Sequence, residues 1–246
     1  TRCSRDWSSD VCSSDLRSGE IVGVAGVTGN GQKELFECIV GVRSTESGKL
    51  LLGGKDITRA SVSEIASMGL SSMGMASIPE DRLKEGVVPD FSISENLILG
   101  LHNKKFFKFS GCMMDTKQVD RFSEDCIKDF DISTPTASQP IRNLSGGNIQ
   151  KVVLARELSG NPICLIADMP TRGLDVGAIE YVHNRLLMQC EKGTGILLFS
   201  DDLDEILNLA DRILVIFKGS IVADLPATAS REEIGLFMAG SLGGNQ

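Results

Sequence analysis

Apolar and polar positions along the chain follow two different periods. Continuous apolar runs of strand length stand at residues 20–26, 163–167 and 195–199. Longer segments between them, such as residues 178–190, carry apolar side chains at helical spacing. Because buried strands that alternate with amphipathic helices form parallel sheets covered by helices, this pattern predicts an α/β fold with a mainly parallel sheet.

Smaller elements are predicted between and after these runs. We expect a helix at residues 32–42, and glycines divide residues 46–58 into the short strands of a hairpin. Ser92 and Glu95 have the spacing of a capping box, so another helix is expected to begin there. The remaining predicted elements are a short helix at 61–69, a strand that runs into a polar loop at 75–82, a helical, loop-rich region at about 93–148 and a final strand pair at 212–224.

A glycine-rich loop, GVTGNGQKEL, joins the first apolar run to the helix that follows it. Strand, glycine loop and helix are the context in which G-x-x-x-x-G-K-[ST] wraps the phosphates of a nucleotide. Gly26, Gly29 and Gly31 keep the backbone cradle possible, but Gln32 and Lys33 stand where Lys and then Ser or Thr are expected. The loop therefore predicts a phosphate site that lacks its principal cation.

Composition narrows the classes of function. The 246 residues are 41% hydrophobic and 24% charged, with a net charge of -8, which suits one globular domain that has a lobe. An acidic chain without a large basic cluster is not expected to bind nucleic acid. The apolar runs are shorter than the ~18 residues needed to cross a bilayer, so any membrane association is expected to pass through another protein. The seven cysteines show no metal-ligand spacing and are interpreted as reduced thiols.

The N-terminal segment differs from the rest of the chain. Residues 6–16, DWSSDVCSSDL, have no amphipathic period and repeat SSD twice. They resemble the conceptual translation of a sequencing-library adapter, and the alternative is a flexible polar N-terminus. We therefore expect residues 1–16 to be non-native, and we expect the native sequence to begin near Arg17 with further sequence lost upstream.

Four more motifs follow the glycine loop in a set order. Residues 144–148 read LSGGN, an apolar strand ends at Asp168, PTRGLD occupies residues 170–175, and a last apolar strand ends at Asp201. Together with the glycine loop, this order resembles the nucleotide-binding domain of ABC transporters. The resemblance covers residues 17–246.

Within that family, the chain is most similar to the C-terminal nucleotide-binding domain of nucleoside importers, with importers of simple sugars as the neighbouring branch. The stretches that carry this similarity are GNGQ, PTRGLDVGA, DRLKEGVVPDFSISENL and EEIGLFMAG. The resemblance implies a P-loop, RecA-like α/β core, a helical lobe near residues 93–148 and a small, truncated antiparallel β part. It also implies that an N-terminal nucleotide-binding domain of the same native chain precedes Arg17.

ATP and Mg²⁺ are the ligands that the resemblance implies. Asp168 stands where the family has its Mg²⁺-linked carboxylate and is the candidate metal ligand, whereas Met169 replaces the glutamate that polarises water and Asp201 replaces the switch histidine. The candidate catalytic positions are Ser145, Gly146, Gly147, Asp168, Met169 and Asp201. The candidate nucleotide-binding positions are Gly26, Thr28, Gly29, Asn30, Gly31, Gln32, Lys33, Glu34, Glu80 (in place of the family's glutamine), Leu144, Asn148, Gln150 and Asp175.

The changes around the loop predict weak or absent hydrolysis of the ATP that this domain itself holds. Gln32 offers phosphate a neutral hydrogen bond, worth about 1 kcal/mol against about 1.5–3 kcal/mol for a charged donor, so binding is expected to weaken about tenfold. Lys33, displaced by one residue, is an alternative source of positive charge. Met169 cannot accept a proton, and the loss of a general base costs about 10²–10⁴-fold in rate.

The LSGGN signature, in contrast, is intact. ABC domains pair head to tail, so each ATP lies between one domain's loop and the other domain's signature. The resemblance implies that Ser145, Gly146 and Gly147 present a hydroxyl and backbone N–H groups to the γ-phosphate of ATP bound by the N-terminal domain. We therefore expect an asymmetric pair with one competent site and one degenerate site.

The resemblance also implies where the protein works. Transmembrane permease subunits are expected to contact residues 79–94, an extracytoplasmic substrate-binding protein acts indirectly, and the chain is peripheral at the cytoplasmic face of the cell membrane. Two alternatives remain open: a soluble ABC ATPase outside transport, and a structural ABC domain that binds no nucleotide. His183, which has no companion ligand in sequence, is interpreted as a structural helix residue.

Overall fold

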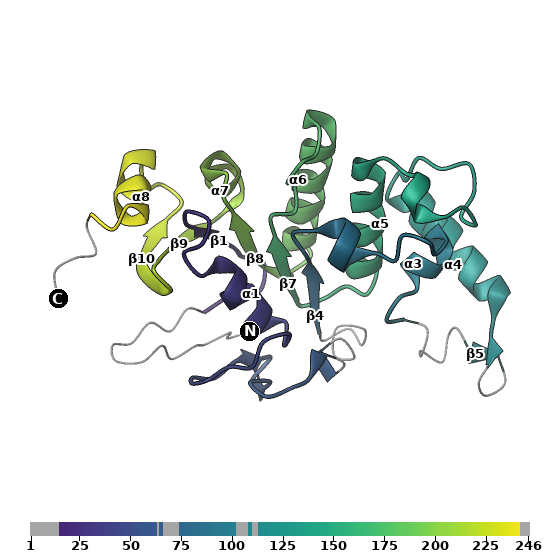
Figure 1. The fold of residues 1–246 in the computed structure, drawn as a ribbon, viewed down its shortest axis with the longest axis horizontal. Helices are drawn as coiled ribbons and strands as arrows, with labels where there is room; N and C mark the ends of the chain where they lie inside the picture. Colours follow the sequence, from purple (N-terminus) through teal and green to yellow (C-terminus); the bar gives the residue numbers. More distant parts are fainter. Residues whose placement is uncertain (1–14, 63, 66–73, 102–107, 110–112, 242–246) are drawn as a thin grey trace.

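The computed structural model describes residues 15–62, 64–65, 74–101, 108–109 and 113–241. A six-stranded sheet lies at its centre, with the strand order β10-β9-β1-β8-β7-β4 (Figure 1). Its strands are β1 Ile21–Ala25, β4 Met75–Ile78, β7 Cys164–Asp168, β8 Gly195–Ser200, β9 Arg212–Phe217 and β10 Ser220–Pro226. Every pairing in this sheet is parallel except that of β10 with β9, so the prediction of a mainly parallel sheet is confirmed.

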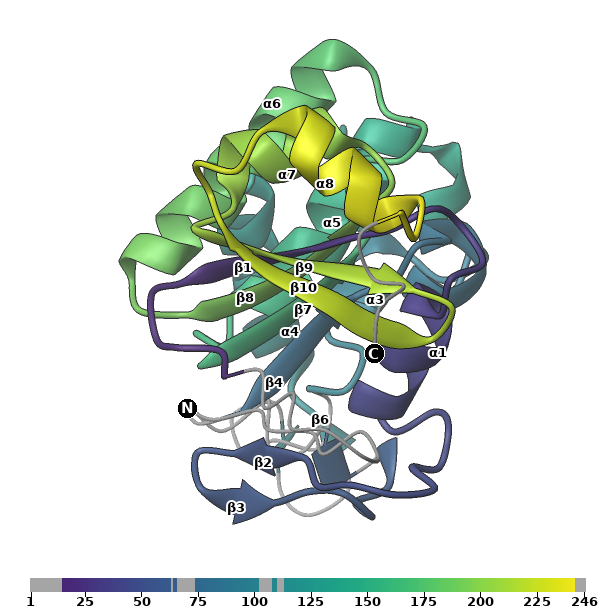
Figure 2. The same ribbon diagram turned by 90° about the vertical axis from the view of Figure 1, so that its left-hand side faces the viewer.

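Helices cover both faces of the sheet, and alternate side chains of each strand enter different hydrophobic clusters. On β1, Ile21 and Ala25 belong to one cluster, whereas Val22 and Val24 belong to the other. Figure 2 shows α5 to α8 on one side of the sheet and α1 on the opposite side. These helices are α1 Gln32–Ile39, α5 Gly146–Leu158, α6 Val176–Glu191, α7 Leu203–Leu209 and α8 Arg231–Met238. Burial on both faces explains why the strands are continuous apolar runs.

A helical lobe lies beyond the β4 edge of the sheet (Figure 1). It contains α3 Ile93–Leu97, β5 Lys108–Phe109, β6 Met113–Met114, α4 Thr116–Asp129 and the 3₁₀ turn η3 Ile141–Asn143. The capping box predicted at the start of α3 is confirmed, because Ser92 and Glu95 satisfy each other's backbone N–H groups. Helix α5 joins the lobe to the core, since it contacts α3, α4 and β4.

A small hairpin packs on the α1 side of the sheet (Figure 2). It consists of β2 Leu51–Leu52 and β3 Lys55–Asp56, paired antiparallel. Gly53 and Gly54 connect the strands with φ angles of 57° and 81°, which residues with a side chain rarely adopt. The predicted hairpin is therefore confirmed, and its truncation stays a prediction.

Three details differ from the expected elements. Helix α1 ends at Ile39 rather than at residue 42, because Gly41 turns the chain with a φ of 81°. The polar loop after β4 contains a π-helical turn, η1 Arg82–Gly86, and α8 follows the final strand pair. The helix expected at residues 61–69 lies largely outside the described residues. None of the helices in the described ranges is long and apolar enough to cross a bilayer.

The end of the N-terminal segment packs against the core. Leu16 is 5% exposed and belongs to the same hydrophobic cluster as Val22. A Cβ atom added to Gly195 would lie 2.6 Å from the Arg17 carbonyl oxygen and 3.0 Å from Leu16 Cγ, so β8 needs glycine at this point of contact. Leu16 therefore occupies a place in the fold although it falls within residues 1–16, which the sequence predicts to be non-native. The non-native origin of residues 1–16 stays a prediction.

Candidate nucleotide site

The glycine loop connects β1 to α1, and glycines determine its path. Gly29 and Gly31 have φ angles of 91° and 107°, and Gly31 is the N-cap of α1. A Cβ atom on Gly26 would lie 2.6 Å from both Gln32 Nε2 and Ile216 Cγ2. No side chain caps the first turn of α1, so its N–H groups face outward, as an anion site requires.

Asn30 anchors this loop to the turn between β9 and β10. Its side-chain amide donates to the carbonyl of Val27 at 3.0 Å, and its Oδ1 accepts from the backbone N–H of Lys218 at 2.9 Å. The backbone N–H of Gly219 donates to the Asn30 carbonyl at 2.8 Å. Thr28, another predicted site residue, is exposed on this loop.

Gln32 does not point outward to a ligand. Its side chain is 5% exposed, and Nε2 donates to the Val27 carbonyl at 3.2 Å, within the loop itself. Its Oε1 atom is buried without a hydrogen-bond partner among the described residues. The neutral donor expected for phosphate is thus used to hold the loop together.

Lys33 and Glu34 are both exposed on the first turn of α1. Lys33 lines the same pocket as Asp168, and its positive charge lowers the pKa of that carboxyl. A displaced lysine is therefore present close to the carboxylate at the end of β7, although one residue further along the helix than the usual loop lysine.

Asp168 ends β7 and is only 4% exposed. Its pKa is raised to about 6, chiefly by burial, because the charged carboxylate loses hydration. The negative charges of Glu85, Asp201 and Glu37 contribute to the same increase. The carboxyl thus lies where additional positive charge would be favourable, and Lys33 supplies part of it.

The residues around Asp168 suit Mg²⁺ poorly. Mg²⁺ in phosphate sites takes one or two carboxylates together with phosphate oxygens and water, and Asp168 can serve as one of them. Lys33, however, replaces the hydroxyl ligand, and Glu80 is already paired with Arg172. No group of three His, Cys, Asp or Glu side chains in the described part of the chain is arranged to hold a metal ion. Asp168 stays the predicted ligand.

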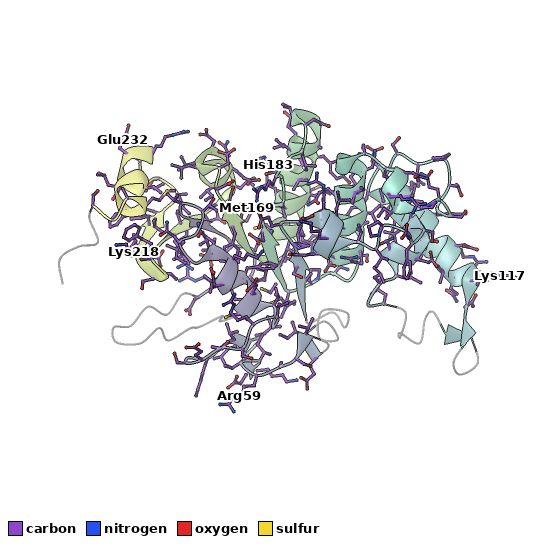
Figure 3. The ribbon with its side chains drawn as sticks, viewed as in Figure 1. Arg59, Lys117, Met169, His183, Lys218 and Glu232 are labelled. Atoms are coloured by element: carbon purple, nitrogen blue, oxygen red, sulfur yellow. The ribbon has the colours of Figure 1, made fainter. Side chains whose placement is uncertain are left out.

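Met169, labelled in Figure 3, follows Asp168. Its backbone is left-handed, with a φ of 44°. The backbone N–H of Met169 donates to the Phe199 carbonyl at 2.9 Å, and its side chain is 8% exposed. Its sulfur accepts a weak contact from Arg172 Nη1 at 3.9 Å. A thioether here can neither accept a proton from water nor orient water strongly.

Asp201 is exposed at the end of β8, and its negative charge acts on Asp168. Next to it lies a buried network that the sequence did not reveal. Glu205 is 4% exposed and accepts hydrogen bonds from Ser200 Oγ at 2.6 Å and Thr171 Oγ1 at 2.8 Å. His183 Nε2 lies 2.9 Å from Glu205 Oε1. This network ties α6 and α7 to the ends of β7 and β8.

The signature lies where the lobe joins the core. Ser145 is the N-cap of α5, and its Oγ accepts from the backbone N–H of Asn148 at 3.4 Å and from Asn148 Nδ2 at 3.0 Å. Gly146 and Gly147 form the first residues of α5. Ser145 is exposed, so a hydroxyl and helix N-terminal N–H groups are available to a ligand from another molecule.

The other predicted positions near the signature have structural contacts. Gln150 is 2% exposed and donates through Nε2 to the Pro170 carbonyl at 2.8 Å, and its contact with nucleotide stays a prediction. Asn148 Oδ1 accepts from the Ser133 N–H at 2.8 Å, and Asp175 caps α6 by accepting from the Ala178 N–H at 2.9 Å. Leu144, half-buried, packs against the core cluster.

The loop and the signature belong to different parts of the sheet. The loop follows β1, whereas α5 packs on β4, and β8 and β7 lie between those two strands. Figure 1 shows α1 and α5 separated along the sheet. The two sets of outward N–H groups therefore do not converge on one ligand within this chain.

A pocket of about 670 Å³ opens between α1, β4 and η1. Lys33, Glu37, Glu85 and Asp168 line its charged part, and its apolar part includes residues from α1, β4 and the start of the lobe. The pocket thus joins the region around Asp168 to the segment that follows β4.

Arg82 and Arg172 were also missed by sequence reasoning. Arg172 forms an ion pair with Glu80, and Arg82 Nη1 donates to the Arg172 carbonyl at 2.7 Å. Both arginines stand in charged or turn-forming stretches that indicate solvated loops, so no local pattern marks them.

Comparisons with known proteins show which sequences this chain resembles. A family model described as ABC transporter matches residues 10–172. The chain is 45% identical over 227 residues to the guanosine import ATP-binding protein NupO of Bacillus subtilis strain 168, covering 92% of this chain and 43% of the relative. It is 40% identical to the nucleoside import ATP-binding protein NupA of Lactococcus lactis, with 92% and 44% covered. For the ribose import ATP-binding protein RbsA of Oceanobacillus iheyensis the identity is 40%, with 94% and 44% covered. The chain therefore spans less than half the length of these relatives.

Solved structures share the fold. A dimeric post-hydrolysis ATP-binding cassette bound to ADP and Pi aligns with a TM-score of 0.72 at 21% identity, covering 89% of this chain and 90% of that chain. A nucleotide-free cassette from an ABC transporter aligns with a TM-score of 0.70 at 21% identity, covering 97% and 93%. These matches confirm the predicted P-loop ABC ATPase fold.

Proposed function

Because the chain belongs to the ABC transporter family, we propose that it forms part of the ATP-binding subunit of an importer of nucleosides or simple sugars. The names of the relatives, which concern guanosine, nucleoside and ribose import, support this solute class. We assign the chain to the C-terminal of two nucleotide-binding domains in one native chain, because Gln32 replaces the loop lysine while the signature is intact.

The main support for this proposal is the separation of the loop from the signature along the sheet. Two strands lie between the strand that leads into the loop and the strand that supports α5. A nucleotide that needs both sets of N–H groups must therefore lie between two domains, with the loop from one and the signature from the other. The exposed Ser145 side chain is available for that contact.

In this proposal, the domain's own loop binds ATP weakly and hydrolyses it poorly. Gln32 donates to Val27 instead of a ligand, and the positive charge of Lys33 acts on Asp168. Met169 stands where a carboxylate base is needed and cannot take a proton. The loop thus keeps an anion-binding backbone but lacks the groups that activate water.

The signature completes the other site. Ser145 Oγ and the N–H groups at the start of α5 would donate to the γ-phosphate of ATP held in the N-terminal domain's loop. Donors that are positioned in advance at a helix N-terminus stabilise charge that develops on phosphate oxygens. Asn148 orients the Ser145 hydroxyl through its side-chain amide at 3.0 Å. Mg²⁺ bound with that nucleotide would neutralise charge on the phosphates.

The permease is proposed to dock at the segment after β4. The pocket between α1, β4 and η1 has an apolar portion that includes Val87 and Val88, and exposed Leu83 and Phe91 lie on the same segment. Such an apolar surface on an acidic chain suits a helix of a membrane partner. This docking would place the chain peripherally at the cytoplasmic face of the membrane, with the substrate-binding protein acting through the permease.

The test is steady-state ATP hydrolysis by the full chain with its permease subunits in nanodiscs, comparing wild type with Ser145→Arg. A bulky cation at the signature should displace the donors and reduce turnover about 100-fold. Ser230→Arg is the matched control, because Ser230 is another exposed N-cap serine, at the start of α8. Its turnover should stay within about twofold of wild type.

Unchanged turnover in Ser145→Arg would overturn the proposal that this signature completes a working site. The chain would then be a structural ABC domain. Equal losses in the two variants would show that the lost helix cap, and not the lost nucleotide contact, is responsible.

A further inference from the structure

Three segments that are distant in sequence meet around the side chain of Arg82. They are η1 with the residues just before it, the first turn of α5, and the turn at residues 170–173 that follows β7. Arg82 Nη1 donates to the Arg172 carbonyl at 2.7 Å, and Nη2 donates to the Gly173 carbonyl at 3.4 Å. A single guanidinium therefore holds two consecutive carbonyls of the turn.

The same guanidinium lies against the start of the signature helix. A Cβ atom added to Gly146 would lie 2.8 Å from Arg82 Nη2 and 3.6 Å from Arg82 Cζ. Gly146 thus leaves the space that Arg82 occupies. The position of the Ser145–Gly147 turn is consequently set by contact with a side chain that comes from the segment after β4.

A second arginine holds the other end of η1 on α5. Arg156 Nη1 donates to the Gly86 carbonyl at 2.8 Å, and a Cβ atom on Gly86 would lie 3.3 Å from Val153 Cγ2. Between Arg82 at one end and Arg156 at the other, η1 lies along α5 at close contact. A displacement of η1 must therefore displace α5 or break these contacts.

The turn at residues 170–173 is tied to the same two segments independently. Gln150 Nε2, on α5, donates to the Pro170 carbonyl at 2.8 Å. Arg172 forms an ion pair with Glu80, which stands just before η1. The three segments are thus cross-linked in every pairwise combination, and Arg82 contacts both of the others at once.

An arginine is required for this bridge. The planar guanidinium presents several N–H groups in a fixed fork, so it can donate to two carbonyls and stack on a glycine at the same time. A lysine carries the same charge on a single point and cannot reproduce that geometry. A cation at the N-terminus of a helix is also unfavourable by itself, so the two carbonyls are needed to hold Arg82 there.

We infer that Arg82 is a positioning residue that transmits movement of the segment after β4 to the signature turn. When the permease displaces that segment, Arg82 carries the Ser145–Gly147 turn and the 170–173 turn with it, and so changes the contacts offered to ATP in the partner domain. This inference rests on the proposed function, in which the permease contacts this segment and the signature acts on the partner's ATP.

The experiment measures how strongly the permease stimulates hydrolysis. Steady-state ATP turnover of the full chain would be determined with and without permease subunits in nanodiscs, for wild type, Arg82→Ala and Arg82→Lys. We expect the stimulation ratio to fall about fivefold in Arg82→Ala, while the KM for ATP changes by less than about twofold. Arg82→Lys should fail to restore the ratio, because the charge is kept but the fork is lost.

Matched controls separate this role from a general loss of structure. Arg231→Ala removes another half-exposed arginine, which pairs with Asp204 on α7 far from the signature, and should leave the ratio unchanged. The melting temperature of Arg82→Lys should stay within about 2 °C of wild type. If Arg82→Ala does not fold, Arg82→Lys by itself decides the question.

Three results would overturn the inference. One is an unchanged stimulation ratio in both Arg82 variants. Another is full rescue by lysine, which would assign the effect to charge alone. The third is a raised KM at an unchanged ratio, which would make Arg82 a direct nucleotide contact. Ser145→Arg distinguishes these failures from failure of the proposed function: if that variant loses turnover, the signature acts on ATP and only the role of Arg82 is wrong.

Discussion

The glycine loop and the signature both place glycines at the N-terminus of a helix, yet their side chains are used in opposite ways. In the loop, Gln32 turns back and donates to the Val27 carbonyl, and α1 has no side-chain cap. In the signature, Ser145 caps α5 from an exposed position, and Asn148 orients its hydroxyl. One helix N-terminus has lost its ligand-directed side chains, and the other has kept them.

The glycines of the loop are needed by the fold whether or not a nucleotide binds. Gly26 is packed so closely that a Cβ atom would lie 2.6 Å from Ile216, and the Cβ of a residue at Gly31 would lie 3.1 Å from Gly219 Cα. A retained glycine pattern is therefore weak support for ATP hydrolysis. The side chains at positions 32, 33 and 169 are more informative, because packing alone does not require lysine, threonine or glutamate there.

Equivalent substitutions in the two regions should reduce ATP turnover by unequal amounts. Ser145→Arg and Thr28→Arg each place a bulky cation at an exposed position beside a glycine-rich helix start. In the full chain with its permease, we expect ATP turnover to fall about 100-fold for Ser145→Arg. Thr28→Arg should change it by only about twofold, as for other exposed substitutions. Equal losses would show that this domain's own loop is catalytically important.

Neutralising Asp168 should stabilise the chain at neutral pH. Its pKa is raised from 3.8 to about 6 in the folded state, so between those values the folded chain binds a proton that the unfolded chain has released. The free energy of unfolding therefore falls as pH rises from about 4 to about 6, by at most roughly 3 kcal/mol in total. Above that range this contribution is level. Asp168→Asn should remove this pH dependence in urea unfolding at pH 4.5 and pH 7.5.

Asp120→Asn is the control for that measurement, since Asp120 is exposed on α4. The pH dependence of its unfolding should match that of wild type. If Asp168→Asn behaves in the same way as Asp120→Asn, the carboxyl at the end of β7 is not held in an unfavourable environment. The loop region has then lost fewer of its nucleotide-binding groups than we infer.

Rebuilding the loop should make the two regions more alike. Gln32→Lys combined with Lys33→Thr restores the charged donor and the hydroxyl, and should tighten ATP binding to this domain about tenfold. Fluorescence titration with trinitrophenyl-ATP measures the change. Adding Met169→Glu should leave the affinity nearly unchanged and raise hydrolysis. An unaltered affinity in the double variant would mean that Lys33 already supplies the charge.

The smallest expected effect concerns the orientation of the signature serine. Asn148→Ala removes one hydrogen bond to Ser145 and one to the Ser133 N–H. It should lower the free energy of unfolding by about 1 kcal/mol, measured by urea denaturation, and reduce turnover modestly. Gln118→Ala, at a half-buried position on α4, is the control. A gain in turnover would show that Asn148 restrains the serine.

Much of the fold follows from short-range patterns in the sequence. Apolar runs of strand length became β1, β7 and β8, because both faces of the sheet are buried, and the Ser92–Glu95 capping box begins α3 as its spacing predicts. The turn glycines also predict the small hairpin, because the φ angles above zero in its turn favour glycine. The motifs at the candidate site also lie at the ends of the elements expected for them.

Only the tertiary structure decided how the site's side chains are used. Glu205 joins three other elements from within an acidic stretch, and Arg82 reaches the Arg172 carbonyl across 90 residues. Gln32 turns inward, where its Nε2 donates to the carbonyl of Val27. A hydrophobic period depends on neighbours a few residues away, so the sequence itself reveals it. A bridge between segments on β4, β7 and α5 exists only after those elements have packed, and no local pattern encodes it.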